Sequence, residues 1–388
     1  MSIVRRAAAL AVLIALTALA AGPASASARP APSLIPRHPT VYVANRGSRT
    51  VSPISTVTSR SGPLIPVGRG PQTIAITPDY TRAYVANDTD NTVTPIVTAT
   101  NTPLAPIKVG RFPDAIVISP DGKMAYVSNG ASGRPGTVIP IVLKTGTPLA
   151  PIPVGSSPIA LAITPDGKML YVLDFGHSVT PIVTATGKAL TPIPVGAFAA
   201  IMAMSPDGKT LYVDGGPGDE VLPISTATNT AGTPIPGTGN YGWFDMAISP
   251  NGKTLVAGNF QGDTVDVINL ATRHVIGPVN VGGNPFQIAI TPNSALAYVA
   301  NGGGVVPIKL SDGKPLSVIP TGPRGRGAFA IAITPDGKLA YTANYNSGTS
   351  TAISIPAGRV VHTARVGTFP GAVAIAPSLV SNCQPCTG

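Results

Sequence analysis

Short apolar runs alternate with turn residues along this chain, and the pattern returns about every 43 residues. Most copies hold an apolar run, a Ser/Thr-Pro-Asp/Asn turn and a second apolar run that contains Tyr-Val. The turn prolines are Pro78, Pro120, Pro165, Pro206, Pro250, Pro292 and Pro335, with Pro377 in a degraded eighth copy, Ala-Pro-Ser. Short apolar runs between turns predict strands, and a period in the low forties is typical of a β-propeller blade.

One copy shows the four strands that we expect in each blade. Residues 114–119 form strand A, and residues 123–128 form strand B after a type I turn at Ser119-Pro120-Asp121-Gly122. Residues 137–143 form strand C, and residues 148–154 form strand D. Short turns between consecutive strands predict one antiparallel meander, which is one blade.

Prolines recur in the C and D strands. Those of strand C are Pro53, Pro95, Pro140 and Pro181, and those of strand D are Pro106, Pro151, Pro153, Pro192 and Pro194. Proline removes a ladder donor, so it belongs on edge strands such as D, where it also hinders pairing with other chains. In strand C the prolines predict either a bulge or a position whose N–H would be unpaired.

Counting the strands predicts how the ring closes. The first B strand, near Tyr42, has no A strand before it, and the last A strand, near Ala374, has no B strand after it. Pairing these two strands in one blade gives eight four-stranded blades in a single domain over residues 40–377, with seven blades as the alternative.

The repeated motifs resemble those of the YVTN-repeat β-propeller family. Tyr-Val-Ala/Ser-Asn begins at Tyr42, Tyr84, Tyr126 and Tyr298, and Pro-Asp-Gly-Lys begins at Pro120, Pro165, Pro206 and Pro335. Asp174 and Gly215 replace the motif Asn, and Val256 replaces Tyr. The family is commonly seven-bladed and mostly extracellular or periplasmic. The resemblance implies the fold and an exported protein, but it implies no particular chemistry.

The N-terminus predicts export. Arg5 and Arg6 precede an apolar stretch, and small-x-small cleavage sites follow, so residues 1–28 are expected to be a signal peptide. A membrane anchor is the alternative, but the apolar stretch is shorter than the ~20 residues that a span needs. Residues 29–39 are a Pro-rich leader expected to be disordered. In an exported protein, Cys383 and Cys386 in the tail at 378–388 predict a local disulfide.

The net charge of +10 permits anionic partners, but no Lys/Arg-rich tract or nucleic-acid module is present in the sequence. Strand parity places the D-to-A and B-to-C loops on one end of the ring, and these loops vary between blades. The candidate ligand-binding residues there are Arg69, Arg111, Arg324 and Arg326 as a basic arc, facing Tyr241, Trp243 and Phe244 as an aromatic wall. Such a site predicts an anionic or sugar-like ligand.

Catalytic and metal-binding patterns are weak. His38, His177, His274 and His362 fall in different blades or outside them without metal-ligand spacing. We therefore predict no catalytic residues, no metal and no cofactor. The expected function is a secreted, monomeric, non-enzymatic scaffold that binds a ligand or protein through its loop face. The alternatives are a propeller hydrolase of the lactonase type and a haem-carrying propeller.

Overall fold

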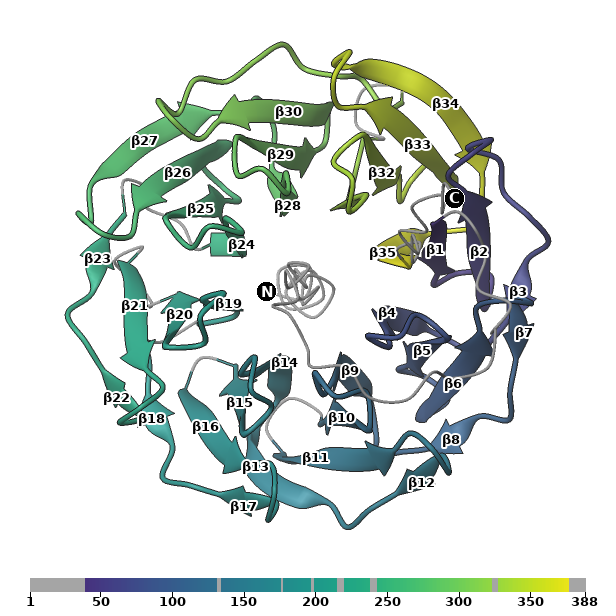
Figure 1. Cartoon of the computed structure of the whole chain (residues 1–388), viewed down its shortest axis with the longest axis vertical. Helices are drawn as coiled ribbons and strands as arrows, with labels where there is room; N and C mark the ends of the chain where they lie inside the picture. The colour runs from purple at the N-terminus through teal and green to yellow at the C-terminus, as the bar shows by residue number, and fades with distance from the viewer. Residues whose placement is uncertain are drawn as a thin grey trace, which may run out of the picture.

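The structure, a computed structural model, is an eight-bladed β-propeller (Figure 1). It describes residues 39–130, 134–175, 177–196, 199–214, 220–237, 243–322 and 327–376, apart from the side chains of Trp243 and Phe244. The signal peptide, the leader and the C-terminal cysteines lie outside these residues. Within the described part of the chain, no helix is long and apolar enough to cross a membrane. The predicted all-β class and the count of eight blades are confirmed.

Each blade contributes one strand of each kind, numbered here from blade 1 to blade 8. The A strands, nearest the axis, are β35 (Pro370–Ala376), β4 (Pro71–Ile76), β9 (Pro113–Ile118), β14 (Pro158–Ile163), β19 (Met202–Met204), β24 (Trp243–Ile248), β28 (Pro285–Ile290) and β31 (Ala330–Ile333). The B strands are β1 (Thr40–Asn45), β5 (Arg82–Asn87), β10 (Met124–Asn129), β15 (Met169–Asp174), β20 (Thr210–Asp214), β25 (Thr254–Asn259), β29 (Leu296–Asn301) and β32 (Leu339–Ala343).

The C strands are β2 (Thr50–Ser55), β6 (Thr92–Val97), β11 (Pro135–Val142), β16 (Ser178–Val183), β21 (Glu220–Ser225), β26 (Thr264–Asn269), β30 (Gly304–Lys309) and β33 (Thr349–Ser354). The D strands are continuous only in blades 6 and 8, as β27 (Val275–Asn280) and β34 (Arg359–Arg365). Elsewhere they are short: β3 (Ile65–Pro66), β7 (Thr102–Pro103) and β8 (Ile107–Lys108), β12 (Thr147–Pro148) and β13 (Ile152–Ser156), β17 (Lys188–Ala189) and β18 (Ile193–Pro194), and β22 (Thr230–Ala231) and β23 (Ile235–Pro236).

The ring closes as the strand count predicts. The C-terminal strand β35 pairs antiparallel with the N-terminal strand β1, with Val373 opposite Val43. Both side chains belong to a buried cluster that also contains Ala330 and Tyr341 of blade 8. The closing blade is therefore held by a backbone ladder and by apolar packing against its neighbour.

The motif tyrosines join neighbouring blades. The Tyr42 hydroxyl of blade 1 lies 2.8 Å from Asn101 Oδ1, to which it donates, in the C-to-D turn of blade 2. The hydroxyls of Tyr341 in blade 8 and Ser59 in blade 1 are 3.1 Å apart across the closing interface. Tyr42 and Tyr341 are almost fully buried, so burial raises the pKa of each phenol and the rings fill the space between blades.

The prolines of strand C face outward, which explains how a central strand tolerates them. Tyr84 lies opposite Pro95 in an unbroken β5–β6 register, so the bulge alternative is wrong for this blade. The Pro95 carbonyl accepts from the backbone N–H of Leu104 on the D side. Since the N and C=O of one strand residue point the same way, the missing donor also faces strand D. The ladder with strand B loses nothing, and an unpaired N–H position is the correct alternative.

The expected continuous D strand at 148–154 is wrong. The structure has two pieces, β12 and β13, which both pair with β11 and leave residues 149–151 between them. Pro151 lies in that gap and Pro148 ends β12, so the proline-rich edge cannot sustain a full ladder.

Candidate functional site

The D-to-A and B-to-C loops lie on one end of the ring, which we call the loop face. Hydrogen bonds join the two kinds of loop: the Arg46 N–H donates to the Phe369 carbonyl at 3.0 Å, and the Asp88 N–H donates to the Gly70 carbonyl at 2.9 Å. These bonds agree with the face assignment from strand parity.

A glycine in the D-to-A loop lets this loop pack against the motif Asn. A Cβ placed on Gly110 would lie 2.7 Å from the Cβ of Asn129, and one on Gly68 would lie 2.9 Å from that of Asn87. The Val-Gly pattern before each A strand therefore serves close packing in these blades. It gives the loop face a rigid base, and the residues that differ between blades stand on this base.

The predicted basic arc is only partly visible. Arg69 forms an ion pair with Asp90, with Nε 2.5 Å from Oδ1, and this pair compensates its charge. The pair and the hydrogen bond from the Arg69 N–H hold the pKa of Asp90 below its usual range. Arg111 is exposed, with its guanidinium 5.9 Å from the centre of the Phe112 ring. The other predicted site residues, Arg324, Arg326, Tyr241 and the side chains of Trp243 and Phe244, lie outside the described part.

A different set of aromatic residues meets on the loop face. Five rings form a continuous sequence of contacts, which we call the aromatic row: Phe260, Phe286, Phe329, Tyr345 and Phe369. Successive ring centres are 5.5, 5.0, 5.5 and 5.1 Å apart. The row crosses blades 6, 7 and 8 and ends in blade 1. Phe369 is exposed, and the other four rings are half-buried.

Charged and polar side chains continue the row into blades 1 to 3. We call this group the charged arm: Arg46, Asp88, Gln72 and Asp114. Arg46 is hydrogen-bonded through its N–H to Phe369, and its guanidinium forms an ion pair with Asp88. The Gln72 amide donates to Asp114 at 3.3 Å. The aromatic row and the charged arm thus form one crescent, apolar over one half and ionisable over the other.

Asp114 is the unusual acid of this crescent. Removal from water, assisted by the nearby negative charge of Asp88, raises the pKa of Asp114 to about 8. Arg46 opposes this shift through its positive charge, and the Gln72 amide opposes it by hydrogen bonding. At neutral pH the Asp114 carboxyl is therefore mostly protonated, and a hydrogen-bond donor is present beside the Arg46–Asp88 pair.

Two phenylalanines of the loop face have an unusual backbone. Phe112 and Phe369 occupy equivalent positions just before an A strand, with φ of 51° and 50°. Bulky residues seldom adopt this left-handed conformation, which costs free energy. Both rings are nevertheless about half exposed, at 47% and 49%, so little burial offsets that cost. Such strained, exposed aromatics are typical of positions kept for contacts with another molecule.

Sequence reasoning missed the crescent because it compared only the D-to-A loops. Arg46, Asp88, Phe260 and Tyr345 each follow the motif Asn directly, and Phe286 and Phe329 are the second residues of the aligned A-strand segments. Aligning the eight repeats at these two positions would have shown apolar rings in blades 6 to 8 and charges in blades 1 to 3.

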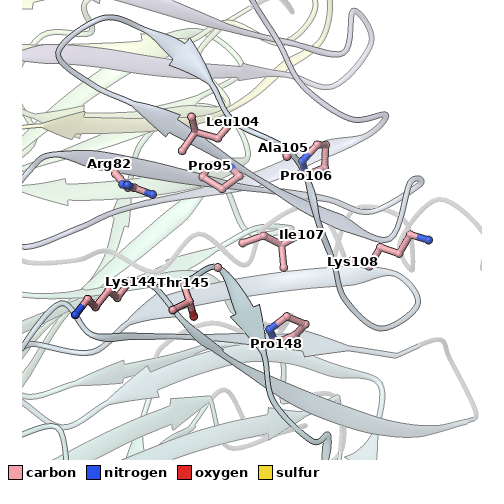
Figure 2. A pocket seen from close by; sticks show the side chains of 11 residues that line it. Arg82, Pro95, Leu104, Ala105, Pro106, Ile107, Lys108, Lys144, Thr145 and Pro148 are labelled. Carbon is pink, nitrogen blue, oxygen red and sulfur yellow. The ribbon is translucent and has the colours of Figure 1, made fainter.

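The outer rim carries a second surface feature, a groove of about 390 Å³ between blades 2 and 3 (Figure 2). Its lining includes three prolines and three cations, Arg82, Lys108 and Lys144, around Leu104. No predicted site residue lines it. The groove lies far along the blades from the A strands, since it is built from B and C strands, D-strand pieces and a C-to-D turn.

Comparison with known proteins establishes the fold alone. No protein-family profile matches the chain, and no curated protein sequence is similar to it. Among solved structures, the dihydro-heme d1 dehydrogenase NirN in complex with DHE is similar with a TM-score of 0.73 and 17% identity, covering 90% of this chain and 77% of NirN. Kuenenia stuttgartiensis hydrazine synthase has a TM-score of 0.58 and 22% identity, covering 74% and 95%.

A functionally unknown protein from Desulfotomaculum acetoxidans is also similar, with a TM-score of 0.56 and 17% identity over 87% of this chain and 99% of that one. At these identities the likeness concerns architecture. The fold and its loop face define an eight-bladed β-propeller with an amphipathic crescent at one end.

Proposed function

We propose that this protein is an exported binding scaffold that receives a ligand or a protein partner at the crescent of its loop face. The observation that carries the proposal is the aromatic row. Five rings in contact, none of them fully buried, form a larger apolar surface than scattered surface residues provide. A contiguous apolar surface with a polar border is typical of an interaction site.

The row is not required by the packing between blades. Seven buried clusters account for the core of the described residues, and of the five rings only Phe329 packs against one of them. Phe260, Phe286, Tyr345 and Phe369 contact mainly one another and the loop face. Their apolar area is therefore available for burial by another molecule, which is the usual source of binding free energy.

Export is the second part of the proposal, and the sequence supports it. Arg5 and Arg6, the apolar stretch after them and the small residues near Ala28 have the order of a secretory signal. Outside the cell, a protein with few charged residues and proline-blunted edge strands can remain a stable monomer.

A binding role agrees with the chemistry of the described residues better than hydrolysis does. Within the described ranges, no three His, Cys, Asp or Glu side chains gather as a metal site would require. The NirN structure was solved with a bound molecule, so a ring of this architecture can accompany ligand binding. This likeness supports a scaffold and does not identify the ligand.

The test is a ligand screen by thermal shift, followed by calorimetry with matched variants. Phe369→Ala and Phe286→Ala remove rings from the row, and Leu149→Ala removes an exposed apolar side chain from the outer rim as a control. We expect hits to lose affinity in the two Phe variants and to keep it in the control. Hits that bind all three variants equally would place the binding site elsewhere and refute the proposal.

A further inference from the structure

The charge balance of the crescent indicates which ligands fit it. The arginines on this part of the loop face already have partners: Arg46 forms its ion pair with Asp88, Arg69 with Asp90, and Arg111 stands over the Phe112 ring. An incoming anion would have to compete with these partners. Asp114, in contrast, has no cation of its own in direct contact among the described residues, and only the Gln72 amide is hydrogen-bonded to it.

The aromatic row favours the same sign of charge. The faces of aromatic rings carry a negative potential that attracts cations and repels anions. Tyr345 and Phe369 lie at the end of the row nearest the charged arm, since the Arg46 N–H binds the Phe369 carbonyl. A positively charged group beside these two rings would also approach the arm that contains Asp114.

We infer that the crescent binds an organic cation, a protonated or quaternary amine attached to a flat or apolar body. This inference rests on the proposed function and names the ligand class for that same site. The apolar body contacts the aromatic row, and the cationic group lies over Phe369 and Tyr345 and faces Asp114. Aromatic surfaces combined with a carboxylate are a chemically suitable receptor for such ligands.

The protonation of Asp114 couples binding to pH. The groups that face this carboxyl are Asp88 from the B-to-C loop of blade 2, Arg46 from that of blade 1 and Gln72 from β4. A cation prefers the ionised carboxylate, so its binding releases a proton wherever Asp114 is still protonated. Because the pKa of Asp114 is about 8, binding should strengthen from pH 6 to pH 9. An anionic ligand would show the opposite trend.

The experiment uses three small probes of similar shape and different charge: benzyltrimethylammonium, phenylacetate and benzyl alcohol. Affinity for the mature protein is measured by calorimetry at pH 6 and pH 9. We expect benzyltrimethylammonium to bind more tightly than the other two at pH 9, with an affinity roughly tenfold or more lower at pH 6. Asp114→Asn should abolish this pH dependence, and Phe369→Ala should weaken the cation about two- to tenfold.

Three results would overturn the inference: tighter binding of phenylacetate, a cation affinity that does not change with pH, or no detectable binding of the cation. The first two would leave the crescent as a binding site for another class, provided that Phe369→Ala still weakens the probe. Binding that neither Phe369→Ala nor Asp114→Asn affects, while both variants keep the native melting temperature, would refute the proposed site as well.

Discussion

The backbone N–H of Arg46 donates a hydrogen bond of 3.0 Å to the carbonyl of Phe369, although the two residues lie at opposite ends of the described chain. This bond joins the B-to-C loop of blade 1 to the loop that enters the C-terminal strand. It therefore belongs both to the closure of the ring and to the crescent, where the aromatic row meets the charged arm. The stability of the ring and the geometry of the site depend on the same junction.

Deletion of residues 370–388 should destabilise the whole ring, because it removes β35. Strand β1 would lose its inner partner, and Val41 and Val43 would lose the apolar contacts of Val373. We expect a large fall in the melting temperature or loss of cooperative unfolding, measured by circular dichroism. Deletion of residues 377–388 alone is the control and should have little effect. Equal melting of both deletions would contradict closure by this strand.

The motif Tyr should stabilise the interface between blades through its hydroxyl. Tyr42→Phe removes the hydrogen bond to Asn101, and we expect a loss of roughly 0.5–1.5 kcal/mol in the free energy of unfolding. Tyr126→Phe is the matched control, since Tyr126 occupies the equivalent position and the structure shows no hydrogen bond from its hydroxyl. Urea unfolding of both variants measures the difference. A control that loses as much as Tyr42→Phe would show that the hydroxyl contact is unimportant.

The sequence predicted the ring well because the fold depends on features that repeat. The turn prolines and Tyr-Val runs recur at a fixed spacing, and the unmatched strands near Tyr42 and Ala374 leave one economical closure. The site was harder, because it depends on residues that do not repeat. Whether Phe286 contacts Phe329 is decided by the distance between blades, which no local pattern encodes. The pairing of Arg69 with Asp90 likewise comes from loop geometry.

Asp174 should make the stability of blade 4 depend on pH. It replaces the motif Asn and is fully buried, and burial raises its pKa to about 6, above the usual value near 4. The protonated form is thus favoured in the folded state. Its stabilisation is fully present below about pH 4 and is lost as the pH rises through 6.

Asp174→Asn should remove this dependence and restore the amide found in other blades. At pH 8 we expect the variant to be more stable than the parent by about 1–3 kcal/mol. Near pH 4 the two should be similar. The hydroxyls of Ser178 and Thr180, which now donate to the carboxylate, can accept from the amide as Thr92 and Thr94 do from Asn87. A difference that does not vary with pH would contradict the titration of Asp174.

Replacement of a C-strand proline should be tolerated, because its ring nitrogen faces the interrupted D strand. Pro181→Ala keeps the register opposite Tyr171 and adds an N–H on the outer side. We expect a loss of no more than about 1 kcal/mol, mainly from greater freedom of the unfolded chain. The matched change Val172→Pro places proline in the B strand of the same blade, where it should prevent folding. Thermal melts and expression yields would distinguish the two, and severe loss in Pro181→Ala would mean that the proline has an inward role.

Phe112 separates stability from binding most clearly. Its φ of 51° is strained for a bulky side chain, whereas Asn adopts this conformation readily. Because the ring is 47% exposed, Phe112→Asn should leave the free energy of unfolding unchanged or raise it by up to about 1 kcal/mol. If the loop face binds a partner that covers this ring, the same variant should weaken that binding, since the exposed aromatic area is lost. The measurements are urea unfolding and calorimetry with a ligand or partner identified by the screen. A clear loss of stability in Phe112→Asn would show that the ring serves the fold, and its strained backbone would then give no reason to expect a contact there.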